Sequence, residues 1–278
     1  MNQKIKSLFF LIIIFFFTAC GGEMGEKIVP VKPLSICPES LFLKKLSKKK
    51  IFFGHQSVGY NIIDGLSDII KKSKVEQLNI KETRNIDDYK VPIFGHATVG
   101  QNKNPVSKID AFEKIMNDGF GKKVNIAFFK FCYVDITSDT DVDELFNYYK
   151  TRMNHLIKKY PKVKFIHFTI PLRKIRRSRG ITGFIKGLIG REDRHMVDNI
   201  ERFNYNALLK KEYSDKVIFD LAKFESTYPD NSREGFKKGG ELYYALVPQF
   251  TDDGGHLNKN GQKFVSQQFL QFFSKLLK

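Results

Sequence analysis

Short apolar runs alternate with amphipathic helical stripes along most of this 278-residue chain. The run at 124–129, Val-Asn-Ile-Ala-Phe-Phe, is nearly continuous, as expected for a strand that is covered on both faces. This alternation predicts an α/β domain in which a mainly parallel sheet lies between helical layers, joined by right-handed crossovers. We expect strands at 50–53, 78–83, 91–94, 124–129, 163–170 and 216–221, and helices at 39–46, 60–72, 105–117, 141–160, 194–212 and 260–277.

Polar stretches follow three of the expected strands, at 54–61, 95–104 and 130–137. The carboxyl ends of parallel strands meet at one edge of the sheet, where open α/β folds place their sites. We therefore expect these stretches to lie together, joined by the turn at 252–256. The segment 223–250 is loop-rich and aromatic, and the pattern predicts no core strand there.

Ser57 stands where the first strand breaks at Gly54 and a helix restarts at about Val58. A hydroxyl at such a break projects from the mouth of the sheet, beside a helix N-terminus whose free N–H groups favour developing negative charge. This position suits a nucleophile. The alternative is a helix N-cap, which is one of the commonest roles of serine.

Asp253 and His256 lie three residues apart on a turn just before the last helix. A serine needs a base, and the base needs an orienting group, so this turn can supply both. Asp252 is a rival for the orienting role, although the spacing favours Asp253. His256 could instead cap or pack the last helix.

The order Ser, Asp, His resembles that of the SGNH (GDSL-like) hydrolase family. The resemblance lies in Ser57 on a strand-to-helix turn and in Asp253-x-x-His256 followed by Leu-Asn-x-x-Gly, and it covers roughly residues 49–278. It implies a three-layer α/β/α sandwich with a parallel sheet of about five strands, similar to flavodoxin. It also implies hydrolysis of ester or acetyl groups, often on carbohydrates, with Ser57, Asp253 and His256 as the triad.

Two family blocks are altered. The usual Gly-Asp-Ser is Gly54-His-Gln-Ser57, and the strand that usually ends in an oxyanion-binding Asn ends in Lys130-Phe-Cys-Tyr. Gly100 matches the glycine of the second block, so its N–H and that of Ser57 could remain as donors. Substitutes for the missing Asn are Asn102, Lys130 and Tyr133, while His55 and His96 could line the pocket or simply pack inside the fold.

The N-terminus predicts export. Lys4 and Lys6 precede a ten-residue apolar run, which is too short to span a bilayer but suits a signal peptide. The sequence Thr18-Ala-Cys20-Gly resembles a bacterial lipobox. We expect a lipoprotein signal peptide at 1–19, a lipid on Cys20, a tether at 20–48 and a hydrolase domain at 49–278, held outside the cytoplasmic membrane.

The formal charge is +17, and a general excess of lysine is an alternative to an anionic partner. Five of the seven residues at 173–179 are basic, within an expected inserted loop or lid at 172–193. This insert could be a solvated loop, a basic edge of the site or a contact with anionic lipid or glycan; export argues against nucleic acid. Cys37 and Cys132 could pair or stay free, and no metal or cofactor is implied.

Taken together, these features predict a lipid-anchored serine hydrolase acting on a small-molecule or glycan ester. One rival is an inactive surface-binding module of the same fold, which the missing Asn favours. Another is a cysteine nucleophile at Cys132, with His96 or His256 as its base.

Overall fold

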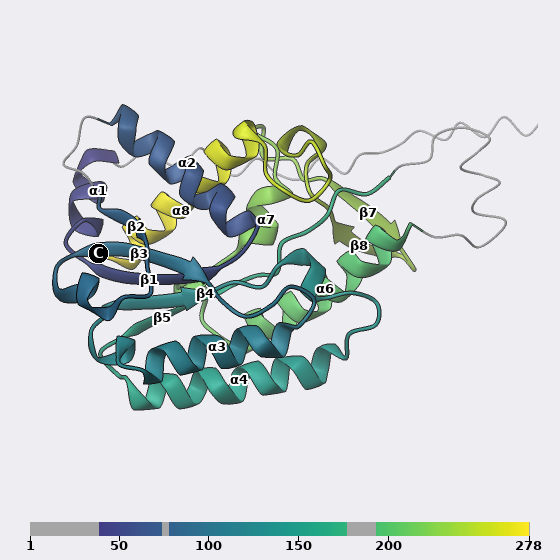
Figure 1. The fold of residues 1–278 in the computed structure, drawn as a ribbon. Coiled ribbons are helices and arrows are strands. Elements are labelled where there is room, and N and C mark those ends of the chain that lie inside the picture. The colour runs from purple at the N-terminus through teal and green to yellow at the C-terminus, as the bar shows by residue number, and fades with distance from the viewer. Residues whose placement is uncertain (1–38, 74–77, 177–192, 278) are drawn as a thin grey trace, which may run out of the picture.

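A six-stranded parallel sheet forms the centre of the domain in the computed structural model, which describes residues 39–73, 78–176 and 193–277. The strand order is β2-β3-β1-β4-β5-β6, and helices cover both faces (Figure 1). The predicted three-layer α/β/α class is therefore confirmed, with six strands instead of about five. The strands are β1 (Lys50–His55), β2 (Ile80–Glu82), β3 (Ile93–Thr98), β4 (Ile126–Phe129), β5 (Lys164–Phe168) and β6 (Ile218–Phe219).

Helices α1, α2, α7 and α8 lie on one face of the sheet, and α3, α4 and α6 lie on the other (Figure 1). Their bounds are α1 (Glu39–Leu46), α2 (Val58–Lys72), α3 (Pro105–Asn117), α4 (Val142–Lys159), α6 (Arg194–Glu212), α7 (Leu221–Glu225) and α8 (Lys259–Leu276). Short 3-10 turns occupy Ile86–Lys90, Phe120–Lys122, Tyr133–Asp135, Asp215–Val217 and Pro248–Phe250.

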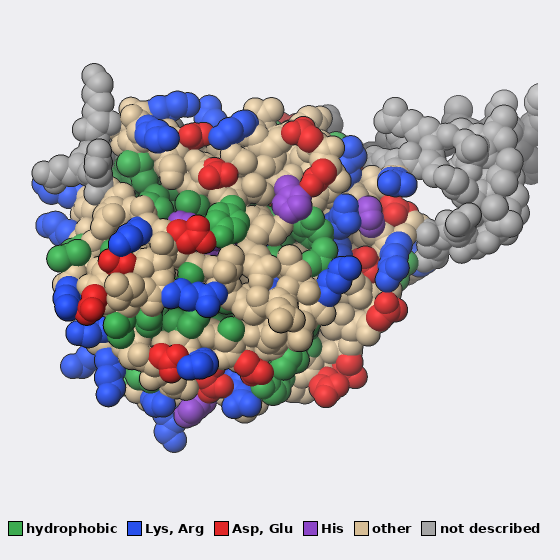
Figure 2. Space-filling view, viewed as in Figure 1, with side chains coloured by type: hydrophobic (Ala, Val, Ile, Leu, Met, Phe, Trp, Pro, Cys, Tyr) green, Lys and Arg blue, Asp and Glu red, His purple; other side chains and the backbone are tan. Residues whose placement is uncertain are grey.

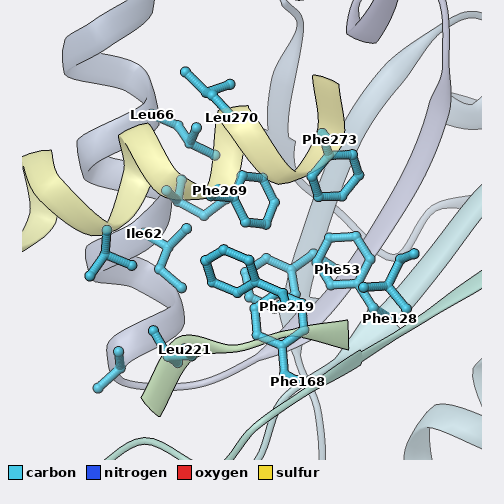
Figure 3. Close-up of a cluster of buried hydrophobic side chains, with 14 of the residues drawn as sticks. Phe53, Ile62, Leu66, Phe128, Phe168, Phe219, Leu221, Phe269, Leu270 and Phe273 are labelled. Carbon is cyan, nitrogen blue, oxygen red and sulfur yellow. The ribbon is translucent and has the colours of Figure 1, made fainter. Parts of the chain in front are cut away.

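The alternation of side chains along β1 divides the core in two. Ile51 and Phe53 point toward α2 and α8, whereas Phe52 points toward α3. Because β1 lies between β3 and β4, all three side chains are completely buried. On the α8 side, Phe269 and Phe273 meet phenylalanines of the sheet, as Figure 3 shows. This phenylalanine layer fixes the height of α8 above the strands.

Helices α2 and α8 approach closely at Gly65. A Cβ on this glycine would lie 2.3 Å from Ser266 Oγ and 2.5 Å from the carbonyl oxygen of Gln262. The Ser266 hydroxyl donates a hydrogen bond to the carbonyl of Ile62 at 3.0 Å, so the contact is polar as well as tight. The absence of a side chain at position 65 therefore sets the spacing between the two helices.

Several expected boundaries shift in the structure. The last core strand, expected at 216–221, is only two residues long because Asp220 caps α7 immediately afterwards. The segment expected as loop contains α7 and a hairpin of β7 (Gly235–Lys238) and β8 (Glu241–Tyr244). The third expected strand extends to Thr98, so the first four residues of the polar stretch at 95–104 belong to β3.

The predicted tether at 20–48 overlaps α1, whose Leu43 and Leu46 are buried in the core on the α8 side. Packed structure therefore begins before residue 49. Residues 1–38 and 177–192 lie outside the described residues. The predicted signal peptide, Cys20 and most of the predicted basic insert belong to these two ranges. Within the described ranges, no helix is long and apolar enough to cross a membrane.

Replacing Gly65 by Ala should destabilise the fold by about 1–3 kcal/mol, since the new methyl group overpacks the contact between α2 and α8. Chemical denaturation followed by circular dichroism would measure this loss. The matched control is Asp64→Ala, one residue earlier on the exposed face of α2, where we expect a change within about 0.5 kcal/mol. Equal stability of both variants would show that the contact is not tight.

Candidate active site

Ser57 lies two residues after the end of β1 and directly precedes the first residue of α2. Its backbone has φ 51° and ψ −112°, an uncommon conformation for a residue with a side chain. The hydroxyl makes no capping hydrogen bond to α2, so the N-cap alternative does not describe its contacts. Strained backbone of this kind is often concentrated at functional positions.

The Ser57 hydroxyl instead meets the ring of His256. Ser57 Oγ lies 2.5 Å from His256 Nε2, and His256 Nδ1 lies 2.5 Å from Asp253 Oδ2. The structure thus brings together the three residues that the sequence analysis grouped, although 199 positions separate the serine from the histidine. The side chains of His256 and Asp253 are 44% and 55% exposed, so the group opens to solvent.

The turn around Asp253 orients its carboxylate. Asp253 Oδ1 accepts hydrogen bonds from the N–H groups of Gly255 and His256, both at 2.8 Å. Burial alone would raise the pKa of Asp253, but the hydrogen bonds from the His256 ring and from these two N–H groups hold it well below its usual range. The carboxylate therefore stays ionised opposite the ring. Asp252 turns away and accepts a hydrogen bond from Asn258.

Two residues that the sequence analysis missed hold this turn in place. Asn61, one turn into α2, accepts a hydrogen bond from the N–H of Leu257 at 3.0 Å. Thr251 is buried, and its Oγ1 accepts from the N–H of Gly254 at 2.9 Å. Asn61 is the fourth residue of α2, four positions after Ser57. This closeness in sequence to the candidate nucleophile is the signal that could have identified it.

Gly100 and Ser57 follow neighbouring strands at the same edge of the sheet. The β1–β3 register pairs the last residues of the two strands, His55 and Thr98, which lie two residues before Ser57 and Gly100 respectively. Gln56 Nε2 donates to the carbonyls of Val99 and Gly100, at 3.0 and 2.7 Å. Gln56, which seemed only a departure from the family motif, therefore fixes this loop. Gly100 has φ 58°, and a Cβ there would lie 2.5 Å from the backbone nitrogen of Lys108.

The backbone N–H groups of Ser57 and Gly100 donate to no partner in the described part of the chain. Two of the proposed substitutes for the missing Asn already make polar contacts. Asn102 Oδ1 accepts from Lys108 Nζ at 2.9 Å, which in turn pairs with the buried Asp135. Lys130 is fully buried, donates to the carbonyl of Phe131, and has its pKa lowered by burial.

Tyr133 stands against the histidine. Its ring meets that of His256 edge to face, with centroids 5.7 Å apart. A Cβ on Gly255 would come within 2.7 Å of the Tyr133 hydroxyl oxygen, so only glycine allows this approach. Burial raises the pKa of Tyr133, which keeps the phenol protonated and able to donate. Its hydroxyl makes no hydrogen bond to a described residue.

His55 and His96 belong to β1 and β3 and are 0% and 5% exposed. His55 Nε2 and His96 Nδ1 are 3.0 Å apart and share a hydrogen bond. A Cβ on Gly59 would lie 2.4 Å from the His55 ring, so the first turn of α2 rests on this imidazole. The two rings are therefore buried supports of the strand-to-helix junction and do not line an open pocket.

Cys132 is a free, fully buried thiol, with its sulfur 3.7 Å from Lys130 Nζ. It forms no hydrogen bond with His96 or His256, so the geometry does not support a cysteine nucleophile. Cys37 lies outside the described residues. No group of potential metal ligands occurs among the residues that the structure describes.

The buried His55 should make the protein less stable in acid. Burial first, then the nearby His96 and Lys130, lower its pKa to about 2, so the folded state stays neutral where the unfolded state takes up a proton. This contribution to stability is present above about pH 6.5 and is lost as the pH falls toward 2, at up to about 1.4 kcal/mol per pH unit.

The free energy of unfolding, measured from pH 7.5 to 5, should therefore fall less steeply in His55→Gln than in the parent. His155→Gln is the matched control, because the His155 side chain is 56% exposed. If His55→Gln and the parent had the same slope, His55 would not be the source of the acid sensitivity.

No protein-family model matches the sequence, and neither does any curated protein. Solved structures do match the fold. A protein described as a platelet activating factor from Streptococcus pneumonia is 14% identical, with a TM-score of 0.47, over 85% of this chain and 91% of its own. A carbohydrate esterase of family 3 from Talaromyces cellulolyticus is 11% identical, with a TM-score of 0.44, over 82% and 96%.

A protein described as a lipolytic member of the G-D-S-L family, from Desulfitobacterium hafniense, is 10% identical, with a TM-score of 0.40, over 81% of this chain and 99% of its own. At such identities and TM-scores, the likeness defines neither the reaction nor the substrate of this chain, which must come from its own side chains.

Proposed function

We propose that this chain is a serine hydrolase that cleaves an ester or acetyl group through a Ser57–His256–Asp253 triad. The observation that carries the proposal is the continuous chain of two 2.5 Å hydrogen bonds, from the hydroxyl through the imidazole to the carboxylate. The low pKa of Asp253 supports it, since an ionised carboxylate stabilises the imidazolium that forms during reaction.

In this mechanism His256 Nε2 takes the hydroxyl proton as Ser57 Oγ attacks the ester carbonyl. The tetrahedral intermediate collapses to an acyl-serine, and the imidazolium returns the proton to the departing alcohol. Water then attacks the acyl group, with His256 again as the base, releasing the acid and restoring the hydroxyl. Asp253 holds the ring with Nε2 toward the serine throughout.

The developing oxyanion needs hydrogen-bond donors, and another group must supply the hydrogen bond that the family Asn usually donates. The N–H groups of Ser57 and Gly100 suit this role, because neither donates to a described residue and both follow neighbouring strands at the same sheet edge. The Tyr133 hydroxyl, also unused and close to the His256 turn, is the third candidate. Lys130 is less suitable, because its ammonium is buried and donates to the carbonyl of Phe131. Asn102 stays a candidate, because only its Oδ1 has a hydrogen-bond partner among the described residues and its amide N–H groups can still donate.

The proposal also covers the molecule that carries the ester and the place in the cell where the protein acts. The exposure of His256 and Asp253 leaves room for an acyl group on a bulky carrier, which favours a glycan over a deeply buried small ligand. The signal-like segment at 1–19 and the lipobox-like Cys20 favour a lipid-anchored protein of the bacterial cell envelope, outside the cytoplasmic membrane.

A fluorophosphonate probe should label the purified protein on Ser57. Labelling should disappear in Ser57→Ala and persist in Cys132→Ala, since the thiol is buried away from His256. Intact-mass spectrometry and peptide mapping would locate the adduct, and circular dichroism would confirm that each variant is folded. Labelling that survives in Ser57→Ala would exclude this serine as the nucleophile.

The rival, an inactive binding module of the same fold, is favoured by one observation, the absent oxyanion Asn. It predicts a folded parent that neither reacts with the probe nor releases acetate from phenyl acetate. Reaction of the parent at Ser57 together with acetate release would reject it.

The two neighbouring aspartates provide a matched test of the triad. Asp253→Asn should lower kcat for phenyl acetate by about 10³- to 10⁴-fold, because the amide no longer holds the ring in the required tautomer. Asp252→Asn carries the same chemical change on a side chain that faces Asn258, and kcat should stay within about threefold of the parent. Equal losses in the two variants would contradict the assignment.

A further inference from the structure

A cavity of about 530 Å³ adjoins the proposed triad. Tyr133 lines it and also meets His256 edge to face, so one ring forms the wall between the cavity and the catalytic histidine. Arg173 lines it too, and its Nε donates to the carbonyl of Gly254, two residues before His256. The volume is within the usual range for small-molecule sites.

The cavity lining contains four Lys and Arg side chains and three Asp side chains. All three carboxylates are already paired. Asp135 is fully buried against Lys108, Asp198 pairs with Arg202 and accepts the N–H of Ser138, and Asp139 pairs with Arg194. Each acidic group of the lining therefore has a cationic partner of its own.

Two cations of the lining remain without a carboxylate among the described residues, Arg173 and Lys103. The guanidinium of Arg173 lies over the Tyr133 ring, with Cζ 5.0 Å from the ring centroid. Asn199 accepts a hydrogen bond from the N–H of Arg173 and donates one to its carbonyl, so the backbone that carries the Arg173 side chain is fixed. Its Nε donates to the carbonyl of Gly254, and its terminal N–H groups make no hydrogen bond to a described residue, so they can donate to a ligand.

Such a guanidinium, stacked and held at one end, suits a planar carboxylate, which accepts two parallel N–H bonds. In the space-filling view, basic and histidine side chains gather with a few acidic ones on the right, beyond the carboxyl ends of the strands (Figure 2). The cavity lies on the α6 side of Tyr133, because His195 and Arg202 of α6 also line it.

We propose that this cavity binds a carboxylate of the substrate, so that the enzyme acts on acyl esters of acidic carriers, such as an acidic saccharide. The proposal rests on the hydrolase function above. We assign Arg173 as the main carboxylate-binding residue. Lys103, which also lines the cavity, contributes a weaker electrostatic attraction. The ester then lies on the Ser57 side of Tyr133 and the carboxylate on the Arg173 side.

The test compares acetate esters that differ only in charge. 4-Acetoxybenzoate and 3-(4-acetoxyphenyl)propanoate each have a neutral amide counterpart, and the two spacers sample different distances from ester to carboxylate. The readout is the ratio of kcat/KM for acid over amide, which is insensitive to a general loss of activity. The parent should prefer at least one acid by about tenfold, as expected for a charge-assisted pair.

In Arg173→Gln this ratio should fall to within about twofold of one, and in Lys103→Gln it should fall partway. The matched control is Lys114→Gln, which removes the same charge from a side chain that is 73% exposed on α3 and paired with Asp118. Its ratio should equal that of the parent. A parent ratio near one for both spacers, or a preference that survives in the Arg173→Gln, Lys103→Gln double variant, would overturn the proposal.

A measurement without turnover separates this proposal from the hydrolase function. Calorimetric titration of folded Ser57→Ala with each ester should show tighter binding of the acid than of its amide, lost on adding Arg173→Gln. If neither ester is hydrolysed by the parent while this difference holds, the hydrolase function fails and the carboxylate site stands. If both esters are hydrolysed and bind alike, the carboxylate site fails and the hydrolase function stands.

Discussion

The tight contact between α2 and α8 is the constraint on which the site depends. Ser57 precedes the first residue of α2, and His256 lies three residues before α8, so the spacing of the two helices sets the distance between hydroxyl and imidazole. The missing side chain at Gly65 permits that spacing. The hydrogen bond from Leu257 to Asn61 then joins the histidine turn directly to the helix that follows the serine.

Periodicity in the sequence predicted most of this architecture. The helices at 39–46, 105–117 and 194–212 have the expected bounds, because each is amphipathic and ends at clear cap or turn residues. The hairpin of β7 and β8 was missed because it lies outside the main sheet, with half of its residues partly exposed and no regular alternation. The two-residue β6 is too short to give a pattern of its own.

At the site, sequence reasoning could group Ser57, Asp253 and His256 because their chemistry requires one another. It could not assign His55 and His96, since a polar residue after a glycine does not reveal whether the strand has ended; both rings are buried within strands. Nor could it find Gln56 or Arg173, whose roles arise from carbonyl groups far along the chain, at Val99 and Gly100 and at Gly254.

Ser57 and His256 are 199 positions apart in the sequence. This separation determines how much of the chain must fold before the proposed triad can form. The base reaches the serine only when α8 docks on α2. Joining two segments so far apart in the chain has a large loop-closure cost in entropy, which only the packing of the whole domain offsets. Under the proposed mechanism, a partly folded chain carries a serine without its base, so reactivity toward esters appears only together with the finished fold.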